Sequence, residues 1–342
     1  MRVRTIVTAA ALGLIGLTGG MVLVEAANPR LNPMVDLLAN KKPVFGLYVP
    51  SAGRGRGAAP AAGTPAPPTK TVADLAKEAL AAPSDFIFDG SMERNVDAGL
   101  PAFTAMLGAL SDNGLLVKTP SPHLSHSIVV KMQEIGTDYA KATEAIGKQL
   151  DAGVTTIMFV GAESAAEAAA GIKAMRYKNK GGTRADSVGN APKIWGLSES
   201  DYKKKADLWP LNKDGELVNW TIVESKEGLA HVREIAAVKG IGVLWPGAGT
   251  LRGVFSNPKM GADGKQEIGP NGRGVTVFDA DAWEKAIQQA LSACKEFNVA
   301  CGYPSNTADD METRYKQGFR VFVGGWGDAG TKMVERGRAL RK

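Results

Sequence analysis

A (β/α)₈ barrel is the fold class that the sequence predicts, and three observations predict it. The chain has 342 residues, 44% of them hydrophobic and 22% charged, which is an ordinary globular composition. Eight short β-rich runs occur along it, and helical patterns lie between them. Strands that alternate with helices form a parallel sheet, which is either closed into a barrel or open and doubly wound. The count of eight favours the barrel, as a single domain over residues 27–342.

The expected strands are apolar runs without strict alternation, as is usual for strands covered on both faces. In order they are "PVFGLYV" (43–49), "DFIFDG" (85–90), "SIVVK" (127–131), "TTIMFVG" (155–161), "NWTIVES" (219–225), "GVLWPG" (242–247), "NVACGYP" (298–304) and "RVFVGGW" (320–326). Amphipathic stretches between them predict helices, among them 165–175, 226–238 and 281–297.

Two insertions interrupt the alternation. Residues 51–70 are rich in Gly, Ala and Pro, and they follow the first strand. We expect them to be flexible and to lie over the C-terminal face of the barrel, with a harmless surface tether as the alternative. Residues 255–274 follow the sixth strand, and the turn signals Asp263-Gly264 and Asn271-Gly272 predict a small hairpin there.

The first 26 residues have the pattern of a secretion signal. Arg2 and Arg4 precede an uncharged stretch from Thr5 to Val24, and the small residues of "VEA" follow it. We expect cleavage after Ala26 and an exported protein, periplasmic or secreted, with no stable membrane span after cleavage. An uncleaved anchor is the alternative, because the apolar run is about as long as a bilayer core is thick.

The net charge of +6 is mild, and the basic residues are scattered along the chain. No basic stripe is interleaved with aromatic residues, so we expect no nucleic-acid partner.

The two cysteines, Cys294 and Cys301, leave two alternatives open. An oxidising compartment would permit a disulfide between them. Cys294 is expected near the end of a helix and Cys301 inside the next strand, which could hold their Cα atoms too far apart to bridge. Two buried free thiols are therefore the preferred prediction.

Active sites of such barrels lie at the C-terminal ends of the strands, so the residues at these ends are the candidates. They are Asp89, Lys131, Gly161 with Glu163, Glu224 with Ser225, Gly247 to Gly249, Tyr303, and Trp326 with Asp328. The three histidines, His123, His126 and His231, lie elsewhere, so nothing supports a Ser/His/Asp site.

Several of these stretches resemble one family. "NPMVDLLANKKPVFGLYV", "DFIFDG", "VVK", "GAESAAEAAAGIKAMRY" and "VESKEGLAHVREIAAVKGIGVLWPGAGTL" follow, in order and spacing, the HpcH/HpaI aldolase and citrate lyase family. The resemblance covers roughly residues 31–49 and 84–341. It implies a (β/α)₈ barrel, a divalent metal, and the cleavage or formation of carbon–carbon bonds next to a 2-oxo acid such as pyruvate. It also implies a homo-oligomer.

The resemblance implies a metal site that is only half present. Glu224 matches the family's metal-binding glutamate, and carboxylate oxygen suits Mg²⁺ or Mn²⁺. The family's second ligand, an aspartate, corresponds to Gly249. Glu163 is a candidate replacement ligand. The metal is therefore expected to be weakly held or lost.

The same comparison implies changed catalytic groups. The family's Asp-Gly-Glu-His motif reads Asp-Gly-Ser-Met at residues 89–92, so Met92 stands in the place of the histidine base. Glu93 is a candidate base beside it, and Asp89 keeps the first position of the motif. The family's carboxylate-binding arginine is here Lys131, which supplies charge without a bidentate fork. Asp328 matches an aspartate that supports the site.

Two functions follow from this. The first is a divergent carbon–carbon lyase that releases pyruvate from a 4-hydroxy-2-oxo acid. Its expected substrate-binding groups are the backbone of Gly247, Ala248 and Gly249 and the side chains of Lys131, Ser225, Trp245 and Asp328. In one variant Lys131 forms a Schiff base with the 2-oxo acid. Glu93 and Glu163 could instead be surface carboxylates at helix starts. The second is a non-catalytic exported barrel that binds a small organic acid or a partner in a pocket of Trp245, Trp326 and Tyr303, unless these rings only pack the core.

Overall fold

The computed structural model describes residues 29–50 and 70–341. The expected secretion signal (1–26) and nearly all of the Gly/Ala/Pro-rich insertion (51–70) lie outside the described residues. In the described part of the chain, none of the helices is both long and apolar enough to cross a membrane.

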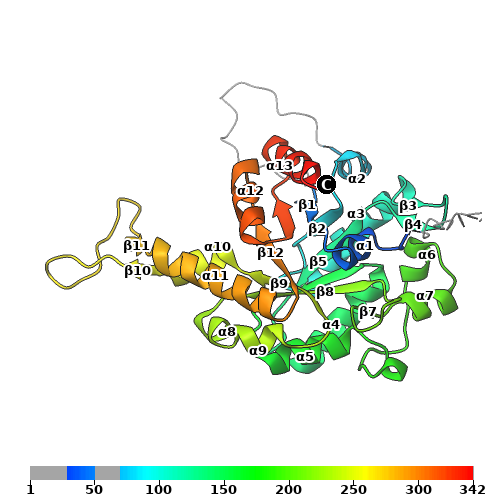
Figure 1. Ribbon diagram of the computed structural model, residues 1–342, viewed down its shortest axis with the longest axis horizontal. Coiled ribbons are helices and arrows are strands. Elements are labelled where there is room, and N and C mark those ends of the chain that lie inside the picture. Colours follow the sequence, from blue (N-terminus) through cyan, green and yellow to red (C-terminus); the bar gives the residue numbers. More distant parts are fainter. Residues whose placement is uncertain (1–28, 51–69, 342) are drawn as a thin grey trace, which may run out of the picture.

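Eight parallel strands close into a barrel, which confirms the predicted fold class. Each strand coincides with one of the eight predicted runs. The strands are β1 (Val44–Tyr48), β2 (Phe86–Asp89), β5 (Ser127–Met132), β6 (Thr156–Phe159), β8 (Leu217–Val223), β9 (Ile241–Pro246), β12 (Ala300–Pro304) and β13 (Val321–Gly324). They pair in this order, and β13 pairs with β1 to complete the ring (Figure 1). Short β7 (Leu208–Trp209) extends the sheet beside β8.

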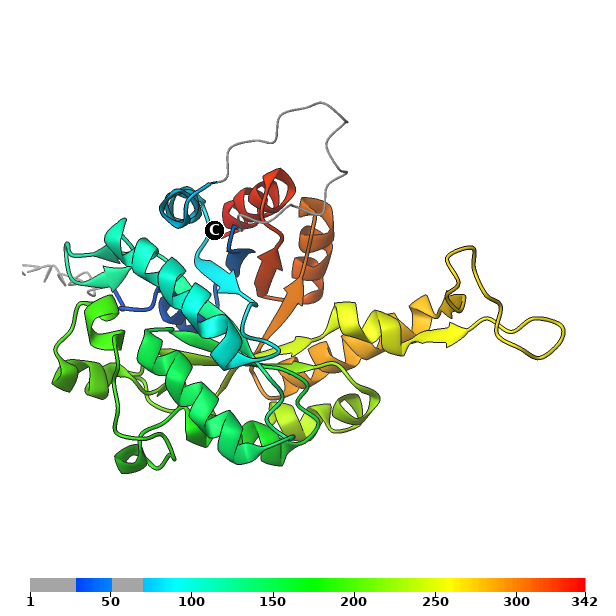
Figure 2. The same cartoon turned by 180° about the vertical axis from the view of Figure 1, so that it is seen from behind.

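Helices surround the barrel and connect its strands (Figures 1 and 2). They are α2 (Val72–Ala81), α3 (Val96–Asp112), α4 (Tyr139–Ala152), α5 (Ala165–Ala174), α6 (Ala191–Trp195), α7 (Glu199–Lys205), α8 (Lys226–Ala230), α9 (Val232–Ala236), α10 (Ala248–Val254), α11 (Ala280–Glu296), α12 (Ala308–Gln317) and α13 (Asp328–Ala339). A 3₁₀ turn (Lys178–Lys180) and the pair β3 (Leu116–Val117) and β4 (His123–Leu124) lie in the connections. Many of these helices begin at a side-chain cap; for example, Ser164 and Thr307 each accept a backbone N–H of the first turn.

The single helix expected over 226–238 is divided at His231, where the backbone leaves helical geometry between α8 and α9. The ring nitrogen Nδ1 of His231 lies 3.0 Å from the carbonyl oxygen of Glu163, in the connection after β6. His231 therefore links the connections that follow β6 and β8.

Side-chain alternation along the strands separates two cores. Residues of one parity fill the barrel interior, among them Phe86 and Phe88 of β2, Trp220 of β8 and Trp245 of β9, and those of the other parity pack against the helices. The rings fit because glycines face them. A Cβ on Gly302 would lie 2.1 Å from Cε2 of Trp245.

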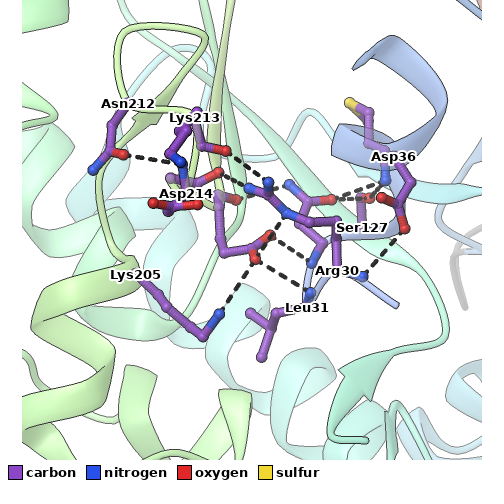
Figure 3. Close-up of polar contacts among 12 residues, drawn as sticks. Arg30, Leu31, Asp36, Ser127, Lys205, Asn212, Lys213 and Asp214 are labelled. Carbon is purple, nitrogen blue, oxygen red and sulfur yellow. Dashed lines mark hydrogen bonds and ion pairs between the residues drawn. The ribbon is translucent and has the colours of Figure 1, made fainter. Parts of the chain in front are cut away.

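Helix α1 (Pro33–Ala39) closes the N-terminal end of the barrel, where its side chains join the interior core. A polar cluster anchors the segment before it (Figure 3). The buried carboxylate of Glu216, just before β8, accepts hydrogen bonds from Nε of Arg30 (3.1 Å) and from the backbone N–H of Asn32 (3.1 Å). Nζ of Lys205 lies 3.6 Å from the same carboxylate. These bonds tie the chain before α1 to the start of β8.

The cysteines correct the preferred prediction of two free thiols. Cys294 and Cys301 form a disulfide with a Cα–Cα distance of 5.6 Å, within the usual range. The expected separation of the two Cα atoms was wrong because the chain reverses sharply after α11 ends at Glu296. Asn298 adopts a left-handed backbone (φ 52°), which turns Cys301 back toward Cys294.

A narrow arm projects from the barrel beyond α10 and α11 (Figures 1 and 2). Its base is the antiparallel pair β10 (Ser256–Pro258) and β11 (Thr276–Phe278). The two predicted turns are confirmed, since Gly264 (φ 72°) and Gly272 (φ 71°) both adopt the left-handed backbone that such turns require.

Candidate active site at the C-terminal mouth of the barrel

A pocket of about 170 Å³, which we name the mouth pocket, lies at the C-terminal ends of the strands, where the fold predicts an active site. Its polar groups are the side chains of Tyr48, Lys131, Glu224 and Thr250 and the backbone of the Gly247–Thr250 segment. Its apolar walls are Phe88, Met158, Ile222, Trp245, Pro246, Pro304 and Val323. A few polar groups among apolar walls are typical of a small-molecule site.

Glu224 reaches the pocket because it follows β8 with the parity of the interior residues Trp220 and Ile222. Gly247, at the end of β9, makes room for it. A Cβ on Gly247 would lie 2.3 Å from the Cβ of Glu224 and 2.9 Å from its Oε2. Glycine is therefore required opposite the glutamate, which explains why the end of β9 is so small.

Lys131 enters from β5 and is paired with Glu93, whose Oε1 lies 3.0 Å from Nζ. The lysine side chain is 15% exposed and that of Glu93 39%, so the pair spans the edge of the pocket. Glu93 itself does not line the pocket. It holds the ammonium group of Lys131 and is placed to orient it.

Tyr48, at the end of β1, is a pocket residue that the sequence did not single out. Burial raises the pKa of its phenol, Lys131 opposes this rise and Glu93 adds to it. The phenol is therefore neutral at neutral pH and can donate a hydrogen bond. The signal was available in "VFGLY", where Val44, Gly46 and Tyr48 share the interior parity.

The predicted backbone cradle is displaced by one residue. The N–H of Gly247 donates to the carbonyl oxygen of Val223 (2.8 Å) and is not free for a ligand. The next three N–H groups, of Ala248, Gly249 and Thr250, have no acceptor within residues 29–50 and 70–341. They line the pocket at the start of α10.

Besides Glu93, four of the predicted site residues do not line this pocket. Asp89 has the opposite parity to Phe88, and its Oδ1 accepts the backbone N–H of Ser91 (2.7 Å). Ser225 likewise turns away and caps α8 by accepting the N–H of Gly228 (3.0 Å). The remaining two, Glu163 and Asp328, are exposed.

Met92, for which the sequence resemblance implied the position of a histidine base, is also outside the pocket. Met92 is fully buried in the outer core, and a Cβ on Gly99 of α3 would lie 2.8 Å from its Cγ. The aromatic lining differs from the prediction in the same way. Tyr303 faces outward against Phe319, at 5.2 Å between ring centroids, and Trp326 is exposed.

The donor set does not fit a resident divalent metal. Glu224 is the single carboxylate among the described residues that line the pocket. No group of three His, Cys, Asp or Glu is arranged to hold a metal ion anywhere in residues 29–50 and 70–341. Affinity for a hard cation depends largely on the number of charged oxygen ligands, and one carboxylate supplies too few.

Comparisons by sequence find no relative: no family model matches the chain, and neither does any curated protein.

Solved structures do match. An HpcH/HpaI aldolase/citrate lyase family protein from Burkholderia cenocepacia J2315 superposes with a TM-score of 0.59 at 18% identity, covering 90% of this chain and 98% of that one. The HpcH/HpaI aldolase of Desulfitobacterium hafniense DCB-2 gives 0.57 at 14% identity, over 89% and 94% of the two chains. Macrophomate synthase gives 0.53 at 18% identity, over 91% and 88%. The chain thus has the barrel fold seen in structures of the HpcH/HpaI aldolase/citrate lyase family.

Proposed function

We propose that the chain is a carbon–carbon lyase of the HpcH/HpaI aldolase/citrate lyase family that releases pyruvate from a 4-hydroxy-2-oxo acid. The observation that carries the proposal is the convergence of Lys131, Tyr48 and Glu224 on one small pocket at the catalytic face of the barrel. The fold shared with aldolases of this family supports it.

The pocket supplies the charges that such a cleavage needs. When the C3–C4 bond breaks, its electron pair moves toward C2, and negative charge develops on the 2-oxo oxygen. The ammonium group of Lys131 and the neutral phenol of Tyr48 are the donors for that oxygen. Glu93 orients Lys131 through its 3.0 Å contact. Lys131 thus takes the electrostatic role that a metal ion would have, since the pocket offers no set of ligands to hold a metal.

Glu224 is the one pocket carboxylate among the described residues and therefore the proton carrier. It takes the proton of the 4-hydroxyl as the aldehyde leaves and returns it to C3 of the enolate, which gives pyruvate and restores the carboxylate. The backbone N–H groups of Ala248, Gly249 and Thr250 receive the substrate carboxylate. The buried indole N–H of Trp245, which has no acceptor among the described residues, gains one in a bound ligand.

A pyruvate-release assay on the mature protein tests the proposal. We expect turnover of 4-hydroxy-2-oxo acids that persists in the presence of a metal chelator. Lys131→Met and Glu224→Gln should each lower kcat by about a hundredfold to a thousandfold, as the loss of one preorganised group does in other enzymes. Lys285→Met, which changes an exposed lysine outside the pocket, is the matched control and should keep full activity.

Absence of pyruvate release, with or without added Mn²⁺, would overturn the lyase proposal. Borohydride treatment with pyruvate checks the role of Lys131. If Lys131 acts only as an ammonium group, this treatment leaves the mass of the protein unchanged. A reduced pyruvate adduct on Lys131, seen as an increase in mass, would show a Schiff base instead.

A second function is favoured by the lining of the mouth pocket, which contains no histidine among the described residues and so offers no imidazole base. In this alternative the barrel binds a small organic acid without turnover. Calorimetric binding of pyruvate that is lost in Lys131→Met, together with no turnover, would support it over the lyase.

We also propose that the protein is exported. The Cys294–Cys301 disulfide supports this, because such bonds persist in oxidising compartments. N-terminal sequencing should find a mature chain beginning near Ala27, and recovery of the full-length chain from the cytosol would contradict it.

A further inference from the structure

A second and larger pocket, of about 440 Å³, lies at the opposite end of the barrel. It is bordered by the end of α1, by the starts of β9 and β12, and by α11, and we name it the N-terminal pocket. Its volume is within the range of small-molecule sites, whereas the mouth pocket holds about 170 Å³. The proposed lyase chemistry does not use it.

The charge of this pocket is one-sided. Four cationic side chains line it, and no acidic side chain of the described residues does. The four are Lys41, Lys42, Lys295 and Arg320. None of them forms an ion pair with a residue in 29–50 or 70–341. Two of them donate to backbone carbonyl oxygens: Nζ of Lys295 to Gln317 (2.9 Å), and Nη1 of Arg320 to Tyr315 (3.0 Å) and Phe319 (2.7 Å). Like charges around one cavity repel each other and attract an anion.

The interior of the N-terminal pocket is apolar. Leu38 of α1, Trp209 of β7, Ile241 of β9 and Leu291 of α11 contribute to its walls. Trp209 is half-buried and offers a flat aromatic surface. A ligand that fits both features carries negative groups beside a flat apolar body.

The ends of two helices, α1 and α11, meet at the rim of the same pocket. Lys41 (φ 53°) and Asn298 (φ 52°) are the two non-glycine residues in the described part of the chain that adopt a left-handed backbone. They lie against each other, with Nζ of Lys41 3.4 Å from Oδ1 of Asn298. The disulfide closes the loop that carries Asn298. Each of them directly follows the C-cap of a helix, α1 or α11, where a left-handed residue is a common way to end the helix.

From the cavity, its one-sided charge and its apolar walls together, we infer that the N-terminal pocket binds a small organic polyanion: a phosphate-type group with at least two negative charges, attached to a flat apolar ring. The cationic rim receives the charged end and the Trp209 side receives the ring. This site is distinct from the mouth pocket and independent of the lyase proposal, so lyase activity is not needed to detect it.

Calorimetry with three probes tests the inference on the mature protein. Pyrophosphate supplies the charge alone, adenosine the ring alone, and ADP both. We expect pyrophosphate to bind, ADP to bind more tightly, and adenosine to show no detectable binding. High salt should weaken the binding of both anions, because exposed charges are screened.

Charge-neutral variants identify the site. Lys41→Gln with Lys42→Gln, and separately Lys295→Gln, should weaken pyrophosphate binding by about tenfold or more, since each removes a charge-assisted contact. All three lysines are exposed, so the fold should be retained. Lys265→Gln with Lys285→Gln removes exposed lysines elsewhere and should bind as the wild type does.

Two results would overturn the inference. One is that neither pyrophosphate nor ADP binds. The other is that the Lys41, Lys42 and Lys295 variants bind both anions as tightly as the wild type, which would place the anion elsewhere on the protein.

Discussion

At the scale of single residues, the two glycines that follow β9 differ in whether packing requires them. Gly247 is required because the side chain of Glu224 occupies the space of a Cβ. Gly249 is not required by packing, since a Cβ there would meet nothing within 4 Å. Gly249, which the sequence resemblance matches to a second metal-binding carboxylate, thus has room for a side chain.

This difference predicts the effect of Gly249→Asp. The new carboxylate would line the same pocket as Glu224 and remain exposed, so the free energy of unfolding should change little. Mn²⁺ binding measured by calorimetry should be weak in the wild type and about tenfold or more tighter in the variant, because charged ligands set the affinity.

Gly253→Asp is the matched control, since it adds a carboxylate to the same helix at another exposed and open position. It should leave Mn²⁺ binding unchanged. If Gly249→Asp gains nothing over Gly253→Asp, the mouth pocket does not retain the geometry of a metal site of this kind.

At the scale of elements, the β10–β11 arm is the part least explained by the barrel. Met260, Ile268 and Val277 are more than half exposed on it, at 56%, 65% and 54%. Large apolar side chains gathered on a narrow projection are typical of an interaction site. We therefore expect the predicted homo-oligomer to form through this arm.

Ile268→Lys tests that expectation. A charge at an apolar contact should shift the mature protein toward the monomer in analytical ultracentrifugation. Val72→Lys, which changes a 43% exposed residue on α2, should leave the assembly unchanged. A wild-type protein that sediments as a monomer would refute the role of the arm.

At the scale of the whole molecule, the stability of the fold should depend on the protonation of His126, which is buried at the N-terminal end of the barrel. Burial lowers the pKa of His126 below 6.5, partly offset by its contact with the carbonyl oxygen of Ala82 and by Asp85, while Arg338 lowers it further. The unfolded chain then binds more protons than the folded one as pH falls below the unfolded value of about 6.5.

The free energy of unfolding should therefore decrease as pH falls from about 7 to about 5, and His126→Gln should reduce that slope. Urea unfolding at several pH values measures both proteins. An equal slope in the two would show that the neutral, buried form of His126 contributes nothing to the pH dependence.

Much of the fold and about half of the site followed from local sequence. Apolar runs of strand length at regular intervals determined the eight strands, because burial on both faces requires them. The placement of Lys131 and Glu224 at the mouth also followed, because each stands at a strand end in the parity of the interior residues. The same alternation directs Tyr48 into the barrel and Asp89, Ser225 and Tyr303 outward, and it could have been read from the sequence.

Other features depend on contacts between distant segments, and only the tertiary structure decided them. The disulfide needed the sharp reversal at Asn298, which its spacing in sequence does not reveal. The N-terminal pocket brings together Lys41, Trp209 and Lys295, which the sequence separates by tens to hundreds of residues. The local pattern determines which residues a strand buries. A pocket instead depends on which strands and helices the closed barrel places side by side.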